Sequence, residues 1–152
     1  MEEKCIVCRE ITVDSPEYER VLDLRNRVLR ESLGRNIRDE DLSRERDYRH
    51  FGAFCGDRIV GTVQFRRESA RHFHLRQFAV EPTRQGEGIG RKILRFAEHS
   101  IASEFPVKIT LHARNTAIVF YKKCGYHTAG ESFEEIGLPH TAMEKMVDGV
   151  DR

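Results

Sequence analysis

Residues 75–126 read LRQFAVEPTRQGEGIGRKILRFAEHSIASEFPVKITLHARNTAIVFYKKCGY, and this stretch decides the fold. Its apolar spacing predicts a strand, a glycine-rich turn that opens a long helix, a second strand and a short helix. The first strand ends at Glu81-Pro82, because proline lacks the amide donor that a central strand needs. The glycine-rich turn therefore stands at the start of the long helix.

Three glycines stand at alternate positions in that turn. Side chains are absent at Gly86, Gly88 and Gly90, so a ligand can approach the backbone closely, and the first amides of a helix carry partial positive charge. The turn therefore predicts a site for phosphate groups. A P-loop would need a lysine and a hydroxyl residue, and the dinucleotide fingerprint would need a glycine where Arg91 stands. The alternative is a glycine-rich turn that only redirects the chain.

The turn and its surroundings resemble the GNAT superfamily of N-acetyltransferases. The segment Gln85–Gly90 is similar to the Q/R-x-x-G-x-G/A loop of that family, and FAVEP is similar to the exit of the family's fourth strand. The segment 131–145, which contains EEIGLPH, further resembles a bacterial ElaA/YjcF-like branch of the family. The family pattern N-x-A-x-x-F-Y-x-x-x-G-F/Y is matched by Asn115, Ala117, Phe120, Tyr121, Gly125 and Tyr126.

This resemblance covers residues 24–146 and implies an α+β fold. The expected sheet is mixed and mainly antiparallel, has about six to seven strands, carries helices on both faces, and splays between strands four and five. A length of 152 residues is typical of one domain, so residues 1–152 are expected to form a single acetyltransferase domain.

Hydrophobic periodicity and turn residues predict the elements along the whole chain. Pro16 is expected at the first position of a helix that Gly34 ends, and the polar segment 36–47 is expected to form a short helix or a mobile segment. Asn115 is expected to cap the last helix and Gly125 to end it. The other expected elements are strands at 5–13, 73–80, 107–112, 126–133 and 141–147, two strands joined at Gly56-Asp57, and a helix at 88–104.

Charge and hydropathy exclude several classes of function. The 26 basic side chains nearly cancel the 25 acidic ones, and a net charge of +1 gives no argument for a nucleic-acid or membrane partner. No apolar run approaches the ~20 residues of a membrane helix, and MEEKCIVCREI at the start lacks the features of a secretory signal. The protein is therefore expected in the cytoplasm, with its cysteines reduced.

Cys5 and Cys8 form a C-x-x-C pair, a spacing that zinc sites also use. A tetrahedral zinc site needs two further ligands at similar spacing, whereas Cys55 and Cys124 stand alone in a strand and at a helix end. No metal site is expected.

The GNAT resemblance implies acetyl-CoA as the co-substrate. By resemblance, the backbone of Phe78 and Val80 hydrogen-bonds the pantetheine arm, with the Val80 amide placed to polarise the thioester carbonyl. The pyrophosphate is expected over the turn, where Arg84 or Arg91 meets its charge, although a solvent-facing arginine is the alternative for Arg91. The expected cofactor-binding residues are Phe78, Ala79, Val80, Arg84, Gln85, Gly86, Glu87, Gly88, Ile89, Gly90, Arg91, Asn115 and Phe120.

Tyr121 is the candidate general acid, at the position of the family's acid. A phenol stays protonated at pH 7 and can give its proton to the departing thiolate; the alternative is a core aromatic residue. The candidate bases are Glu135 and His140, because the strand at 72–80 carries no carboxylate of the kind that many relatives use. A strand histidine bonded to the backbone is the alternative for His140, and Arg76 could contact a substrate carboxylate or orient Glu135.

These features predict an acetyl-CoA-dependent N-acetyltransferase that moves an acetyl group to a primary amine of a small molecule or a protein. Two alternatives stay open: a non-catalytic module that binds or senses acyl-CoA, and an acyltransferase that uses a longer acyl-CoA. A homodimer is a further expectation, because relatives in the family are often dimers.

Overall fold

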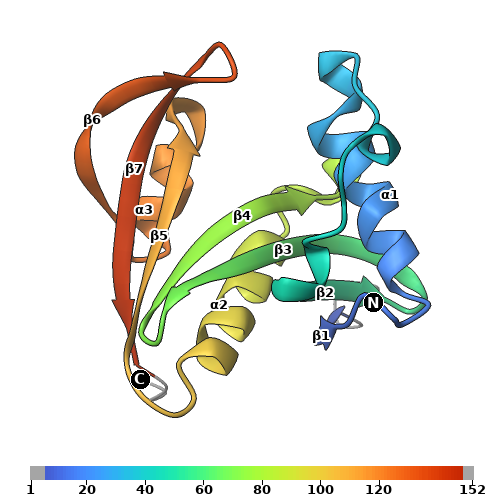
Figure 1. Ribbon diagram of the computed structural model, residues 1–152, viewed down its shortest axis with the longest axis horizontal. Helices are drawn as coiled ribbons and strands as arrows, with labels where there is room; N and C mark the ends of the chain where they lie inside the picture. The colour runs from blue at the N-terminus through green and yellow to red at the C-terminus, as the bar shows by residue number, and fades with distance from the viewer. Residues whose placement is uncertain (1–5, 149–152) are drawn as a thin grey trace. The chain divides into compact units, whose positions relative to one another are not determined.

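The structure is a computed structural model that describes residues 6–148 (Figure 1). In this part of the chain a seven-stranded sheet has the strand order β1-β2-β3-β4-β5-β7-β6. β4 runs parallel to β5, whereas β1 with β2, β2 with β3, β5 with β7 and β6 with β7 are antiparallel. The mixed, mainly antiparallel sheet expected from the sequence is thus confirmed. The strands are β1 (Ile6–Ile11), β2 (Arg49–Cys55), β3 (Arg58–Ser69), β4 (His72–Val80), β5 (Val107–Arg114), β6 (His127–Glu135) and β7 (Leu138–Val147).

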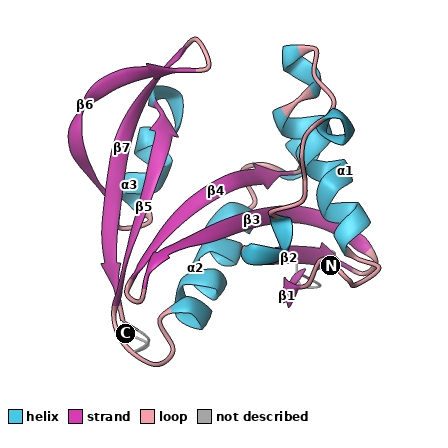
Figure 2. Ribbon diagram, in the orientation of Figure 1, coloured by secondary structure: helices cyan, strands magenta, loops and turns pink. Residues whose placement is uncertain are grey.

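Figure 2 distinguishes the helices from the strands. No helix within the described residues is long and apolar enough to cross a membrane. The α-helices are α1 (Tyr18–Leu29), α2 (Ile89–Ile101) and α3 (Ile118–Lys123). Single 3-10 turns are η2 (Glu31–Leu33), η3 (Ile37–Asp39), η4 (Glu45–Asp47), η5 (Pro82–Arg84) and η6 (Asn115–Ala117).

The chain forms two compact units. Within the described residues, the first comprises residues 6–66 and 76–98, and the second comprises residues 67–75 and 99–148. The division falls within β3, β4 and α2, so each of these elements contributes to both units.

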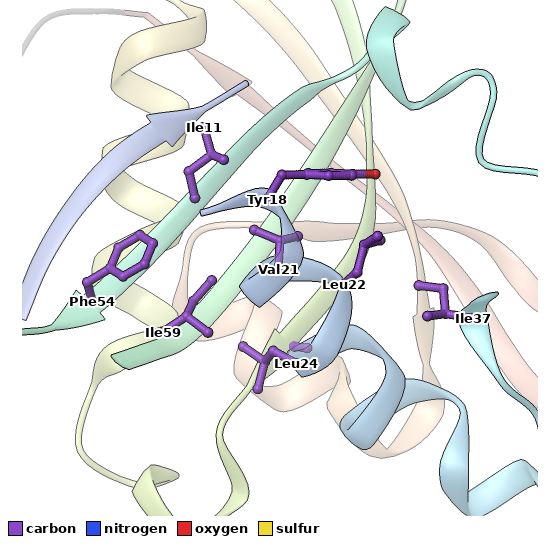
Figure 3. Packing of buried hydrophobic residues seen from close by; sticks show 9 residues of the cluster. Ile11, Tyr18, Val21, Leu22, Leu24, Ile37, Phe54 and Ile59 are labelled. Carbon is purple, nitrogen blue, oxygen red and sulfur yellow. The ribbon is translucent and has the colours of Figure 1, made fainter. Parts of the chain in front are cut away.

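In the first unit, α1 buries one side of the helix against the sheet. Its sequence YERVLDLRNRVL repeats apolar residues at helical spacing, and Val21, Leu22 and Leu24 are each no more than 2% exposed. Figure 3 shows these side chains beside Ile11 and Phe54 of the strands. The complete cluster consists of Ile11, Tyr18, Val21, Leu22, Leu24, Ile37, Phe54, Ile59 and Ala79.

α2 covers the opposite face of the same strands. Successive residues of a strand face opposite sides of the sheet. A Cβ added at Gly52 of β2 would face the α1 side, because it would lie 2.5 Å from Cδ1 of Ile11. Phe51 points the other way, and its ring meets the ring of Phe96 on α2 with 6.1 Å between centroids. Helices therefore lie on both faces of the sheet, as the sequence predicted.

The segment 36–47, expected to form a short helix or a mobile segment, packs against α1. It forms the two turns η3 and η4 separated by irregular backbone. Ile37 is 0% exposed and its amide donates a 2.7 Å hydrogen bond to the side chain of Asn26 on α1. Burial of this one apolar side chain holds the segment against the helix.

The second anchor of that segment is a buried carboxylate. Glu45 accepts hydrogen bonds from the Tyr18 hydroxyl at 2.7 Å, from Arg25 at 2.7 Å and from Gln64 at 3.1 Å. Burial alone would raise the pKa of Glu45, but the bonds from Arg25 and Tyr18 lower it overall. His50 Nε2 donates to the Glu45 carbonyl at 2.8 Å, so the turn is tied to β2 as well.

In the second unit, β5 alternates between its two faces. Val107, Ile109, Leu111 and Ala113 are each at most 1% exposed, whereas the residues between them point to the other face. β6 lies at the edge of the sheet and is exposed along almost its whole length.

Two helix boundaries differ from the sequence prediction. α1 begins at Tyr18 rather than at Pro16, because the Ser15 hydroxyl and amide both bond the carbonyl of Thr12 and close a turn first. α1 then ends at Leu29, and Gly34 closes the following turn η2 with φ 69°. The hairpin predicted at Gly56-Asp57 is confirmed between β2 and β3.

The segment EEIGLPH forms the hairpin between β6 and β7. Glu135 pairs with Leu138, and the two residues between them have positive φ, 48° at Ile136 and 76° at Gly137. Two successive positive φ values are typical of the tight turn that matches strand twist. Glu135 is therefore held in regular strand geometry beside a tight turn.

Candidate active site

In the first unit, the glycine-rich turn leads directly into α2. Gly88 accepts the first helical hydrogen bond, from the amide of Lys92 at 3.0 Å. Gly86 and Gly88 have φ 88° and 83°, the left-handed region that glycine adopts without strain. Among the described residues, chain neighbours aside, no heavy atom lies within 4 Å of where a Cβ of either glycine would stand. Open space therefore surrounds the backbone at the start of a 13-residue helix.

Side chains fix this turn to the strand before it. Gln85 Nε2 donates to the carbonyl of Val80 at 3.3 Å, and Arg84 bonds Glu87 at 2.9 Å across the turn. Ile89 is only 3% exposed and anchors the first residue of α2 in the interior. Of the expected pyrophosphate contacts, Gln85, Gly86, Glu87, Gly88 and Arg91 are exposed, and Arg84 and Gly90 are half-buried.

Gln77 interrupts β4 with a strained backbone. Its φ is 52°, a region that residues other than glycine seldom adopt and that often marks functional sites. The Gln77 side chain accepts a 3.0 Å hydrogen bond from Arg30, the residue that directly follows α1. Arg30 also donates a hydrogen bond to Glu40. The guanidinium of Arg30 lowers the pKa of Glu40, so this carboxylate stays charged and holds the arginine in place. The irregularity falls directly before Phe78.

In the second unit, Tyr121 lies on α3 among aromatic side chains from the helix and from the residues that follow it. It is 8% exposed, and its ring meets those of Phe120 and Tyr126 edge-on, with centroids 5.2 and 5.8 Å away. Burial raises the pKa of Tyr121 above its ordinary value, and the nearby Cys124 raises it further. The phenol therefore keeps its proton throughout the physiological pH range.

Glu135 contacts a histidine that the sequence reasoning did not single out. Its Oε1 lies 2.9 Å from Nδ1 of His112 on β5. Both side chains are a little under half exposed, 43% for His112 and 45% for Glu135. The pair joins β5 to β6 across 23 residues of sequence.

His140 is hydrogen-bonded to the backbone, which is the alternative to a base role that the sequence left open. Its Nδ1 donates to the carbonyl of Leu138 at 2.9 Å, so the neutral ring carries its lone pair on Nε2. The ring is 4% exposed and stacks on Phe133, with 6.2 Å between centroids and 26° between planes.

Asn115 does not cap α3, which corrects the expectation from the sequence. The residue that precedes the helix is Ala117, and no side chain caps it. The Asn115 side chain instead donates to Ser132 Oγ at 3.1 Å and accepts from Thr141 Oγ1 at 2.8 Å. Both ends of the amide thus join the end of β5 to β6 and β7.

The sequence prediction did not single out three histidines, His72, His74 and His112, which lie in a line along one face of β4 and β5. His72 Nε2 and His74 Nδ1 lie 2.9 and 2.8 Å from the same hydroxyl, Thr110 Oγ1. The His74 ring meets the His112 ring edge-on at 4.9 Å. The signal was the repeated spacing H-x-H at 72–74 and T-x-H at 110–112, because alternate residues of a strand share a face.

Sequence comparison identifies the family to which these features belong. The family described as "Acetyltransferase (GNAT) domain" matches residues 12–147. The chain belongs to the GNAT acetyltransferase family. It is 28% identical over 102 residues to the uncharacterized N-acetyltransferase YjcF of Bacillus subtilis (strain 168), which covers 66% of this chain and 72% of YjcF.

Solved structures share the GNAT fold. Escherichia coli ElaA superposes with a TM-score of 0.78 and 19% identity, over 92% of this chain and 99% of ElaA. An aminoglycoside 6'-N-acetyltransferase complexed with coenzyme A gives a TM-score of 0.72 and 19% identity, over 96% and 98% of the two chains. This protein is therefore a GNAT acetyltransferase similar to ElaA and YjcF, as its sequence motifs indicated.

Each unit of this GNAT protein carries one group of the residues predicted from the sequence. The first unit holds the continuous set 78–91, and the second holds Asn115, Phe120, Tyr121, Glu135 and His140. Within residues 6–148, no three or more histidine, cysteine or carboxylate side chains are grouped so that they could hold a metal ion. Cys5 lies outside the described residues; Cys8 is half-buried, and burial raises the pKa of its thiol.

Proposed function

We propose that this GNAT acetyltransferase binds acetyl-CoA through the turn 82–91 and transfers the acetyl group to a primary amine. The observation that carries the proposal is the open backbone at Gly86 and Gly88, at the start of a long helix. Helix-start amides attract phosphate oxygens, and the missing side chains let a pyrophosphate reach them. A coenzyme A complex is known for a protein of the same fold, which supports the choice of cofactor.

The pantetheine arm and the thioester would follow β4. The backbone of Phe78 and Val80 supplies the contacts implied by the family resemblance, and the Val80 amide polarises the thioester carbonyl. The strained residue Gln77 supports this assignment, because a left-handed residue redirects the backbone just before Phe78. A fixed amide donor is worth most where charge develops, and here charge develops on the carbonyl oxygen as the amine attacks.

Tyr121 would act as the general acid. The amine nitrogen forms a bond to the carbonyl carbon, the carbon–sulfur bond breaks, and the departing thiolate takes the phenolic proton. Burial holds Tyr121 protonated before this step, which an acid requires. The same burial makes Tyr121 a weaker acid, so the proton moves only as negative charge collects on sulfur.

The base would come from the C-terminal part of the second unit, with Glu135 and His140 as the candidates from the sequence. His140 has a lone pair on Nε2 but is only 4% exposed. Glu135 is exposed and already bonds His112. The base takes a proton from the amine, because an ammonium nitrogen has no lone pair with which to attack.

The acceptor is a small molecule or a protein that presents a primary amine. We further propose that residues 1–152 act as one acetyltransferase domain in the cytoplasm, as a homodimer and without a metal. The match of one family to residues 12–147, which fall in both units, supports the single domain. A longer acyl-CoA donor and a non-catalytic acyl-CoA sensor are the alternatives.

The experiment measures free thiol released from acetyl-CoA in the presence of spermidine, kanamycin or a peptide with a free N-terminus. Amine-dependent thiol release with an acetylated product confirmed by mass spectrometry is the expected result. Tight CoA binding with no product from any amine would favour the sensor. Faster release from a longer acyl-CoA than from acetyl-CoA would favour the other alternative.

A further inference from the structure

We propose that His112 is the general base of this acetyltransferase and that Glu135 is a positioning residue that orients it. The inference rests on the proposed function and changes the role of Glu135 from base to partner of the base. It assigns a proton acceptor to the protein at a strand position for which no role has been assigned.

The contact between the two residues fixes the state of the imidazole. A carboxylate can only accept a hydrogen bond, so the proton of neutral His112 resides on Nδ1, which lies 2.9 Å from Glu135 Oε1. The lone pair is then on Nε2, the nitrogen that faces away from the carboxylate. Because the His112 side chain is 43% exposed, this arrangement presents an oriented base to solvent and substrate.

Aromatic neighbours restrict how the ring can turn. The ring of Phe133 on β6 meets His112 edge-on at 5.0 Å, and the ring of His74 on β4 does so at 4.9 Å. Together with the hydrogen bond that Nδ1 donates to Glu135, these contacts hold the imidazole on three sides. An oriented base loses little entropy when it meets its substrate.

The titratable neighbours of His112 lie on four strands, its own strand β5 included. β4 contributes His74 and, through the shared hydroxyl of Thr110, His72. β6 contributes Glu135, and β5 carries Lys108 and Arg114 on the same face. β7 places Ala142 directly opposite His112, with His140 and Glu144 two residues to either side. Among the carboxylates of the described residues, Glu135 is the one that accepts a hydrogen bond from His112.

The place of His112 in the sheet supports the assignment. The recorded pairing of β4 with β5 covers three pairs and ends at His74 with Thr110. His112 is the next residue of β5 on that face. His112 therefore continues the line of His72, His74 and Thr110 within the second unit.

His112 meets the requirements of a base better than the two earlier candidates do. The ring of His140 is 4% exposed, so a substrate amine would need a rearrangement to reach it. Glu135 already uses one oxygen to bond His112. In the reaction, the N–H bond of the amine breaks, a bond from the proton to Nε2 forms, and the Glu135 carboxylate stabilises the resulting imidazolium before it returns the proton to water.

The test compares H112Q with H127Q in the full-length protein. His127 also faces a carboxylate, with Nε2 3.6 Å from Glu144, on the same hairpin but far along β6 from Glu135. H112Q should lower kcat/KM for acetyl-CoA plus spermidine, or whichever amine of the panel turns over, by about 10²–10⁴-fold and abolish the acidic limb of the pH–rate profile. H127Q should change neither.

E135Q and H112A test the two roles separately. E135Q keeps the shape of the partner but removes its charge, so kcat should fall with KM little changed while a measurable rate remains. Added imidazole should restore part of the rate of H112A, because a free base can replace the missing one. A structural role would respond to neither the charge nor the imidazole.

Failure of this inference differs from failure of the proposed function. Wild-type protein that binds CoA but acetylates no amine would overturn both. Wild-type activity that H112Q retains, with an unchanged acidic limb, would overturn the role of His112 alone. CoA binding by calorimetry and the thermal midpoint of each variant show that a lost rate does not come from lost folding.

Discussion

Arg30 and Gln77 are 47 residues apart in the sequence and are joined by one hydrogen bond of 3.0 Å, from Nη2 of the arginine to Oε1 of the glutamine. The bond braces the residue of β4 whose φ is 52°. Because Glu40 also bonds Arg30, a partly buried ion pair and a strained strand residue belong to one arrangement.

This arrangement predicts an energetic coupling between Arg30 and Gln77. R30M keeps the length of the side chain but removes its donors, and Q77G permits the positive φ without support. In a double-mutant cycle on the free energy of unfolding, the two changes should couple by about 0.5–3 kcal/mol. Urea unfolding of the four proteins measures it. Effects that add within about 0.5 kcal/mol would show that the bond does not support the strained residue.

The turn before α2 predicts a loss of CoA binding that leaves the fold intact. G88V should weaken CoA binding by about tenfold or more, about 1.4 kcal/mol, because a side chain would occupy the space proposed for the pyrophosphate. Isothermal calorimetry measures the affinity. G34V is the matched control, since Gly34 also has a positive φ, 69°, and open space at its Cβ position. Equal affinities for the two variants would reject the turn as the phosphate site.

Tyr121 predicts a defect confined to chemistry. Y121F keeps the ring and its contacts with Phe120 and Tyr126 but removes the proton, so kcat should fall by about 10²–10⁴-fold with CoA affinity little changed. Burial raises the pKa of Tyr121, so its ionisation should cause no loss of rate below about pH 10. Thiol release from acetyl-CoA, measured at a series of pH values up to about 10, tests both effects. A wild-type kcat in Y121F would exclude Tyr121 as the acid.

His50 predicts how stability depends on acid. Burial lowers the pKa of His50 below its ordinary value, so the unfolded chain binds a proton more readily than the folded one. Stability should therefore fall as the pH drops below about 6.5, the ordinary pKa of histidine. The lowered pKa of Glu45 acts at lower pH, below about 4.3, where unfolded glutamate takes up its proton.

The structure explains why a proton on His50 is unfavourable. Nε2 already donates to the Glu45 carbonyl, and Nδ1 is buried without a hydrogen-bond partner among residues 6–148. H50Q should reduce the change of the thermal midpoint between pH 7 and pH 5. H127Q, which replaces an exposed histidine, should leave that change as it is in the wild type. Parallel curves for wild type and H50Q would assign the acid sensitivity to other groups.

The tight turn between β6 and β7 predicts a stabilising substitution. Ile136 is 61% exposed and has φ 48°, which is costly for a β-branched residue. I136N should raise the free energy of unfolding by about 1 kcal/mol, since asparagine adopts this region more readily. I136V keeps the branched side chain and should change stability little. Identical unfolding curves for I136N and I136V would show that the turn stores no strain.

The parts of the fold that the sequence predicted are those set by neighbours along the chain. The glycines at 86, 88 and 90 place the turn, and Gly56-Asp57 places a hairpin, because each is a local conformational requirement. The start of α1 was misplaced for an equally local reason, the competing turn that Ser15 makes with Thr12. Short side chains that bond their own backbone shift helix ends by one or two residues.

The candidate site was less predictable, because its contacts join distant residues. Asn115 is a residue type that often caps helices, but the pairing of β5 with β7 and of β7 with β6 brings its amide to Ser132 and Thr141 instead. In the same way, nothing near His112 in the sequence indicates that Glu135 will face it. Which distant residues meet on one face of a sheet depends on the strand order and on the register of each strand pair, and a short stretch of sequence contains neither.

The exposed edge of β6 has a consequence for how the protein behaves at high concentration. Open strand edges invite other chains to extend the sheet, and natural proteins discourage this with charge and with irregular pairing. β6 has both, because Glu131, Glu134 and Glu135 lie along it and its register with β7 shifts between Thr128 and Ser132. Two copies placed edge to edge along β6 would set carboxylates against carboxylates. Fibril growth from this side of the sheet is therefore disfavoured, and concentrated stock solutions should resist gelling.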